Sequence, residues 1–114
     1  MFGTPMAALW AAAHHGAPFL SVVFVNRSYS TGTRGLRGTY PDGSAISAGN
    51  YDGGLFDPPP DFAKMAEAAN SYGETVHEPE EVGPALRRGL EQVRNGTPAV
   101  VAVMLPTLVE EMSR

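Results

Sequence analysis

Apolar residues gather in short blocks along this chain, separated by polar segments rich in glycine and proline. Phe19–Val25 and Pro98–Met104 are nearly continuous apolar runs with many β-branched residues, a pattern typical of strands covered on both faces of a sheet. Glu74–Val76 is a third, shorter candidate strand. The pattern therefore predicts three strands, two of them deeply buried.

Helical patterns occupy the segments before and between these strands. Met6–His15 is rich in strong helix formers and follows Pro5, a favoured first helical residue. Asp61 is placed to cap a second helix, which we expect to close at Gly73. A third helix begins at Pro79, ends at Asn95-Gly96, and carries an apolar stripe formed by Val82, Leu86, Leu90 and Val93.

Residues 27–60 are dense in Gly, Ser, Thr, Asp, Asn and Pro, so we expect one long irregular loop there. Loops of this length are uncommon in compact domains and are usually functional or mobile. The alternation of helices and strands around this loop predicts a single α/β domain over residues 1–114, with a parallel sheet. Phe19–Val25 has the composition of a central strand, yet few strands are available to flank it, so the chain resembles part of a larger domain.

Composition and charge narrow the possible functions. The chain has 114 residues, of which 43% are hydrophobic and 18% charged, and this balance excludes a disordered chain. Its net charge of −4 gives no electrostatic basis for nucleic-acid binding. The absence of cysteine rules out disulfides and thiolate metal sites and fits a reducing compartment. With no membrane-spanning run and no export signal visible, we expect a cytoplasmic protein.

The candidate chemistry lies in the turn that follows the first strand. Ligands bind at the carboxyl ends of parallel strands, so polar residues at this point are the expected binding groups. No other segment has the character of an active site. The candidate residues are Asn26, Arg27, Ser28, Tyr29 and Ser30.

Nearly the whole chain resembles the C-terminal cofactor domain of thiamine-diphosphate enzymes, in particular the acetolactate synthase-like branch that includes benzoylformate decarboxylase. The similar segments are Met1–Trp10, His15–Pro18, Val22–Tyr29, Asp57–Ala66, Ser71–Gly73 and Gly96–Val103. The resemblance implies a partial three-layer thiamine-diphosphate-binding fold with about three parallel strands and flanking helices. It also implies a lyase or transferase that acts on 2-oxo acids with thiamine diphosphate and Mg²⁺.

The resemblance further assigns roles to the candidate residues. Asn26 matches the family's second motif asparagine, whose side-chain oxygen binds Mg²⁺, and Ser28 matches the residue that offers its main-chain carbonyl to the same ion. Arg27, Tyr29 and Ser30 match the turn where the backbone approaches the diphosphate. Oxygen ligands of this kind suit a hard cation such as Mg²⁺.

Two departures from the family pattern affect the expected activity. Met1 falls just after the position of the family's Gly-Asp-Gly motif, so the metal-binding carboxylate is missing and the chain looks truncated there. The glutamate that activates the cofactor belongs to a separate domain in the family. We therefore expect weak or absent cofactor binding, no catalytic residue in this chain, and no turnover by the chain alone.

Simpler interpretations exist for several of these residues. An asparagine at the end of a strand, such as Asn26, is more often a turn former than a metal ligand, and Ser28 shares this alternative. The histidines His14, His15 and His77 are expected at the surface rather than on a shared ion. The regular spacing of three glycines is a weak phosphate-loop signal, carried by Gly32, Gly35 and Gly38.

Three hypotheses for function remain. The chain is a fragment of a thiamine-diphosphate enzyme, a non-catalytic remnant that serves as an interaction module, or a small α/β binding domain unrelated to thiamine. The family resemblance argues against the third. The missing neighbour of Phe19–Val25 would leave an apolar strand edge open, so we predict self-association through this edge or pairing with the remaining parts of a parent enzyme.

Overall fold

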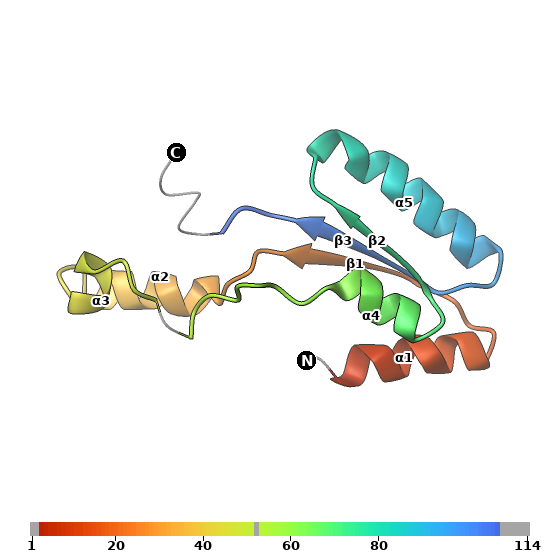
Figure 1. Cartoon of the computed structure of the whole chain (residues 1–114), viewed down its shortest axis with the longest axis horizontal. Helices are drawn as coiled ribbons and strands as arrows, with labels where there is room; N and C mark the ends of the chain where they lie inside the picture. Colours follow the sequence, from red (N-terminus) through yellow and green to blue (C-terminus); the bar gives the residue numbers. More distant parts are fainter. Residues whose placement is uncertain (1–2, 52, 108–114) are drawn as a thin grey trace. The chain divides into compact units, whose positions relative to one another are not determined.

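The computed structural model describes residues 3–51 and 53–107 (Figure 1). Its helices and strands are α1 (Gly3–His14), β1 (Leu20–Val25), α2 (Ser30–Thr39), α3 (Ser44–Ser47), α4 (Phe62–Ala68), β2 (Tyr72–Val76), α5 (Pro79–Arg94) and β3 (Ala99–Met104). The chain divides into two compact units. Unit 1 contains Met1–Val25 and Asp61–Met104, and unit 2 contains Asn26–Pro60 and Leu105–Arg114.

Unit 1 is built on a three-stranded parallel sheet in the order β1-β3-β2. Leu20 of β1 and Tyr72 of β2 both lie opposite Ala99 of β3. The central strand β3 is buried from Ala99 to Val103, as its continuous apolar run predicts. The predicted α/β fold, with three parallel strands flanked by helices, is confirmed.

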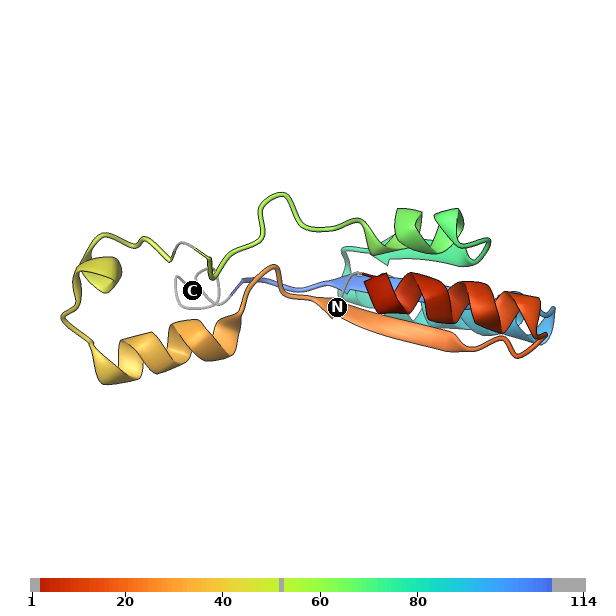
Figure 2. The same cartoon turned by 90° about the horizontal axis from the view of Figure 1, so that it is seen from below.

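Helices cover both faces of this sheet. On one face a core cluster joins Leu9 of α1 and Ala66 of α4 to Val100, with Val23 of β1 packed against it. On the opposite face lies α5, whose Gly89 approaches Leu20 and Val101. Figure 1 shows α5 and α1 on opposite sides of the strands, and α1 lies over the strands in Figure 2.

The helix α4 begins as expected and ends differently. The side chain of Asp61 accepts a hydrogen bond from the Lys64 amide at 3.0 Å, which confirms the predicted cap. The expected closure at Gly73 is wrong: Asn70, with a φ of 57°, turns the chain, and Gly73 lies inside β2. A Cβ on Gly73 would stand 2.1 Å from the Ala63 carbonyl oxygen, so this glycine permits the close approach of α4 to β2.

The helix α5 starts at Pro79 and ends at Arg94, with Asn95 as its C-cap residue, as the sequence predicts. The face that α5 buries is rotated relative to the predicted apolar stripe. Leu90 of that stripe is 42% exposed, whereas Ala85 and Gly89, which lie outside it, are buried. These small residues let the helix axis come close to the sheet, where larger side chains would clash. A Cβ on Gly89 would stand only 2.8 Å from a methyl group of Leu20.

The strand β1 is less covered than its composition predicts. We expected burial on both faces, but Phe24 is 67% exposed and Val22 is 39% exposed. The reason is position: β1 is an edge strand, and α5 packs mainly over β3 and β2. The apolar run identified a strand correctly but did not reveal which of its neighbours are present.

Unit 2 contains two helices where we expected a continuous irregular loop. The helix α2 forms despite its three glycines, each of which lowers helix propensity by about 1 kcal/mol relative to alanine. The Tyr40 amide donates to the Leu36 carbonyl at 2.8 Å and closes its last turn. The glycines therefore lie inside a helix, not in a phosphate-binding turn.

Within the described residues, no helix combines the length and the apolar character needed to cross a membrane.

Candidate functional site

The candidate residues begin directly after β1, at the carboxyl end of the strand. Val25 is the last residue of β1, and Asn26 is the first of unit 2. Arg27 has a φ of 54°, a left-handed conformation that non-glycine residues adopt infrequently and at a cost of about 1–2 kcal/mol. The chain therefore turns sharply at Arg27, between the two residues proposed as metal ligands.

A compact polar cluster forms around this turn. The Asn26 side-chain oxygen accepts a hydrogen bond from the Ser28 amide at 3.2 Å, and the Asn26 amide nitrogen donates to the Ser30 hydroxyl at 3.1 Å. The hydroxyl groups of Ser28 and Ser30 are hydrogen-bonded at 2.8 Å. Ser28 is 7% exposed, and Asn26 and Ser30 are half-buried. The structure thus brings three of the five candidate residues into mutual contact.

A second segment of unit 2 supports the turn, and sequence reasoning missed it. Ser28 and Leu55 form an isolated antiparallel bridge, in which the Tyr29 amide donates to Gly54 and the Phe56 amide donates to Arg27, both at 2.8 Å. The Tyr29 and Phe56 rings meet edge to face with centroids 4.7 Å apart. The apolar pair Leu55-Phe56 after two glycines was the available signal.

The bridge also sets the direction of the Ser28 backbone. In an antiparallel pair of this type, the hydrogen bonds run through the neighbouring residues, so the N–H and C=O of Ser28 itself point away from Leu55. The Ser28 N–H points at the Asn26 side-chain oxygen. The Ser28 carbonyl and the Asn26 amide oxygen therefore lie on the same side of the segment.

Both oxygens have the capacity to bind a cation in this arrangement. An amide oxygen carries two lone pairs, and the Ser28 N–H occupies one of those on Asn26. The other lone pair can serve a metal ion. The donor set is neutral, because the turn contains no carboxylate. It fits a hard cation that takes its remaining ligands from another molecule. That molecule must also supply the negative charge that balances the ion.

The helix α2 begins inside the same turn. Its N-cap, Tyr29, makes no side-chain capping bond, and its first turn holds no acidic residue. The first amide groups of a helix have no intrahelical acceptor and carry the positive end of the helix dipole. This end of α2 suits an anionic group bound beside the polar cluster.

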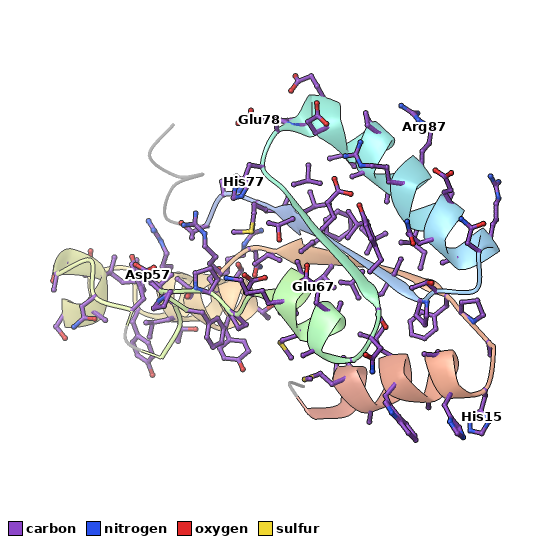
Figure 3. All side chains as sticks on the ribbon, turned by 45° about the vertical axis from the view of Figure 1, so that its right-hand side comes forward. His15, Asp57, Glu67, His77, Glu78 and Arg87 are labelled. Carbon is purple, nitrogen blue, oxygen red and sulfur yellow. The ribbon has the colours of Figure 1, made fainter. Side chains whose placement is uncertain are left out.

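The histidines do not form a metal site. All three are exposed, and Figure 3 shows His15 and His77 at opposite ends of unit 1. His14 stacks on Trp10 with ring centroids 5.0 Å apart, and both side chains are exposed on α1. In residues 3–51 and 53–107, no group of three His, Cys, Asp or Glu side chains is arranged to hold a metal ion.

The ionisable groups with shifted pKa values serve unit 1 as structural contacts. Arg88 of α5 forms two hydrogen bonds with the Glu74 carboxylate of β2, and the Tyr72 hydroxyl donates to the same carboxylate at 2.6 Å. The hydrogen bonds from Arg88 lower the pKa of Glu74, and burial raises the pKa of Tyr72. This network joins β2 to α5 within unit 1.

Comparison with known proteins gives one match. Residues 1–103 match the family model described as "Thiamine pyrophosphate enzyme, C-terminal TPP binding domain". The matched range includes all five candidate residues and every strand except the last residue of β3. No curated protein and no solved structure matches the chain.

Proposed function

This chain belongs to the thiamine pyrophosphate enzymes, as a C-terminal TPP-binding domain, and on this basis we propose that the turn after β1 binds thiamine diphosphate together with Mg²⁺. One observation carries the proposal. The Asn26 side-chain oxygen and the Ser28 carbonyl lie on one side of a turn that leads directly into the N-terminus of α2. The two oxygens that we propose as metal ligands and a helix end that suits an anion therefore belong to one short segment.

Each candidate residue has a distinct role in this proposal. The Asn26 amide oxygen and the Ser28 carbonyl are ligands of Mg²⁺, which also takes oxygens from the diphosphate. Arg27, Tyr29 and Ser30 contribute main-chain groups that approach the diphosphate. Thiamine diphosphate, when bound, supplies the nucleophile and electron sink for chemistry on 2-oxo acids. The residues of this chain bind and orient it.

The more specific assignment is an acetolactate synthase-like lyase or transferase. It rests on the similarity of residues 22–29 and 57–66 to that branch of the family. We also propose a cytoplasmic location, which the absence of cysteine supports. Nucleic-acid and membrane partners are not part of the proposal, since the chain is acidic.

We propose that residues 1–114 alone bind the cofactor weakly and do not turn over substrate. The candidate turn offers the metal two neutral oxygens, and a divalent cation in a protein site usually depends on at least one anionic ligand. The turn also contains no carboxylic acid that could act as a proton donor or acceptor for the cofactor.

Calorimetric titration of thiamine diphosphate, with and without Mg²⁺, tests this function. We expect weak binding that Mg²⁺ strengthens, and we expect Asn26→Ala to abolish the strengthening. Asn95→Ala is the matched control, because Asn95 caps α5 in unit 1 with an exposed side chain. Binding to Asn26→Ala that still responds to Mg²⁺ would refute the assigned site.

A second candidate function is self-association, either as a non-catalytic interaction module or as a means of joining the other parts of an enzyme. The outer edge of β1 is unpaired in the described sheet, and Val22 and Phe24 expose their side chains on its α5 face. Strand edges of this kind pair readily with another chain.

An exposed leucine extends this surface. Arg88 reaches Glu74 on the β2 side of α5, and Leu90 follows two residues later, about 200° further round the helix. Leu90, which is 42% exposed, therefore lies on the β1 side. We name Val22, Phe24 and Leu90 the β1 patch.

Sedimentation of the purified chain tests the role of the β1 patch. We expect a dimer or larger assembly that Phe24→Lys converts to a monomer, because the lysine would place an unpaired charge in an apolar contact. Trp10→Lys is the control, since Trp10 is 55% exposed on α1, which packs on the other face of the sheet. A wild-type chain that stays monomeric at high concentration would contradict this function.

A further inference from the structure

Unit 2 holds no buried apolar side chain among the residues that the structure describes. Its buried residues there are Ser28 and Thr33, both of which carry a hydroxyl group. All of the buried hydrophobic residues described in the chain belong to unit 1, Leu9 and Val101 among them. Because the burial of apolar surface is the main favourable term in folding, unit 2 has little to offset the conformational entropy that its ordering costs.

The large apolar side chains of unit 2 lie at the surface instead. Tyr29 and Tyr40 are 61% and 62% exposed, and Leu36 and Leu55 are exposed as well. Tyr29, Leu36 and Tyr40 are spaced at seven and then four residues, so they lie on one face of α2. That face is therefore only partly covered, and its packing stabilises the helix weakly.

The helix α2 is also too short and too rich in glycine to be stable by itself. It has 10 residues, and they include Gly32, Gly35 and Gly38. Isolated helices shorter than about 12–15 residues are marginal in water even when they consist largely of alanine. Each glycine lowers the equilibrium constant for helix formation about fivefold relative to alanine. The stability of α2 therefore depends on contacts outside the helix.

The contacts at the start of α2 are those of the candidate turn. Ser30, the first residue of α2, accepts a hydrogen bond from the Asn26 side chain at 3.1 Å, and its hydroxyl is hydrogen-bonded to that of Ser28 at 2.8 Å. The first turn is the costly step in forming a helix, because several residues are fixed before hydrogen bonds accumulate. A ligand that fixes Asn26 and Ser28 would thus fix the residue from which α2 propagates.

From these observations we infer that α2 is folded in only a minority of the free molecules, and that binding of thiamine diphosphate with Mg²⁺ at the candidate turn completes its folding. The inference rests on the proposed function and adds a means of regulating that site. When a ligand binds only the folded state, its apparent Kd is the intrinsic Kd divided by the folded fraction. A change that stabilises α2 away from the ligand should therefore tighten binding.

Calorimetric titration of Gly35→Ala with thiamine diphosphate and Mg²⁺ tests this coupling. A Cβ on Gly35 would meet nothing within 4 Å, so alanine fits there and acts through the stability of the helix. We expect the affinity to rise about three- to fivefold, close to the factor by which alanine favours a helix over glycine. Gly83→Ala is the matched control, because it makes the same change at an open position of α5 in unit 1 and should bind like the wild type. An unchanged affinity in Gly35→Ala would overturn the inference.

Amide hydrogen exchange of the wild-type chain supplies the second readout. Without ligand, the amides of α2 should exchange almost as fast as those of an unfolded chain, while those of β3 stay protected. Saturating thiamine diphosphate with Mg²⁺ should slow the exchange of α2 on the order of tenfold or more and leave that of α5 unchanged.

The two readouts separate this inference from the proposed function. Equal protection of α2 and β3 in the free chain would overturn the inference, and binding that Asn26→Ala makes insensitive to Mg²⁺ would still support the proposed function. A titration that gives neither heat nor a change in exchange would remove the proposed function and the inference with it.

Discussion

The glycines at the helix–sheet contacts of unit 1 and those inside α2 of unit 2 differ in what surrounds them. In unit 1, a Cβ added to Gly73 or Gly89 would stand less than 3.0 Å from a neighbouring atom. In unit 2, a Cβ on Gly32, Gly35 or Gly38 of α2 would meet nothing within 4 Å. Gly73 and Gly89 are therefore required by tertiary packing, whereas the glycines of α2 only weaken the helix that contains them.

This comparison indicates how each unit is stabilised. Unit 1 depends on close contact between helices and sheet, so the loss or gain of single atoms there should change its stability strongly. The helix α2 depends on its own hydrogen bonds and on the short bridge at Ser28. Binding elements often come from the less stable parts of a protein, and a bound ligand then stabilises them.

Gly73→Ala tests the packing of unit 1 and should have the largest effect. The added methyl group would overlap the Ala63 carbonyl oxygen, a backbone atom that cannot rotate away. We expect a loss of about 3 kcal/mol or more in the free energy of unfolding, measured by urea denaturation. Gly83→Ala is the control, because its Cβ would meet only the flexible end of Arg87, at 3.7 Å. Equal stabilities of Gly73→Ala and the wild type would show that unit 1 is not closely packed there.

Gly35→Ala tests the opposite expectation for α2. Alanine fits the open space at this position and restricts the unfolded chain, so it should stabilise the helix by about 1 kcal/mol. Helicity of α2, followed through its amide hydrogen exchange, is the measurement. Faster exchange in Gly35→Ala would mean that the glycine face of α2 is in close contact with another part of the protein.

The Glu74–Arg88 network should give the smallest effect, seen in the pH dependence of stability. Hydrogen bonds from Arg88 lower the pKa of Glu74 in the folded state. Glu74 therefore stabilises the fold at pH values above its unfolded pKa, and this contribution disappears as the pH falls through the lower folded pKa. Because Arg88 is 47% exposed, solvent screens the pair, and Glu74→Gln should lower the melting temperature at pH 7 by roughly 2 °C. The difference from the wild type should vanish in strong acid, and a difference that persists there would contradict this account.

Sequence patterns predicted the buried elements of unit 1 well because local signals and tertiary position agree there. The run before Met104 is apolar throughout, and Pro79 and Asn95 mark the two ends of α5. The edge position of β1 was not predictable, since Phe24 is apolar whether or not a neighbour covers it. The role of Gly73 depends on how closely α4 approaches β2, and no local pattern records that distance.

The candidate site was predictable in part. The polar turn at the end of β1 indicated Asn26 and Ser28, and the structure adds the hydrogen bonds that join them to Ser30. The bridge to Leu55 was missed because it joins residues far apart in the sequence. The helix α2 was missed because its glycines outweigh its other residues in any estimate of propensity.

Paramagnetic line broadening by Mn²⁺ tests the central claim most directly, because it detects weak binding and locates it. Mn²⁺ prefers the same oxygen ligands as Mg²⁺ and broadens NMR signals close to it. With thiamine diphosphate present, the amide signals of Asn26, Ser28 and Ser30 should broaden first, and Asn26→Ala should remove the effect. Broadening that leaves this turn unchanged, and begins instead at the acidic start of α5, would contradict the assignment of the cofactor site.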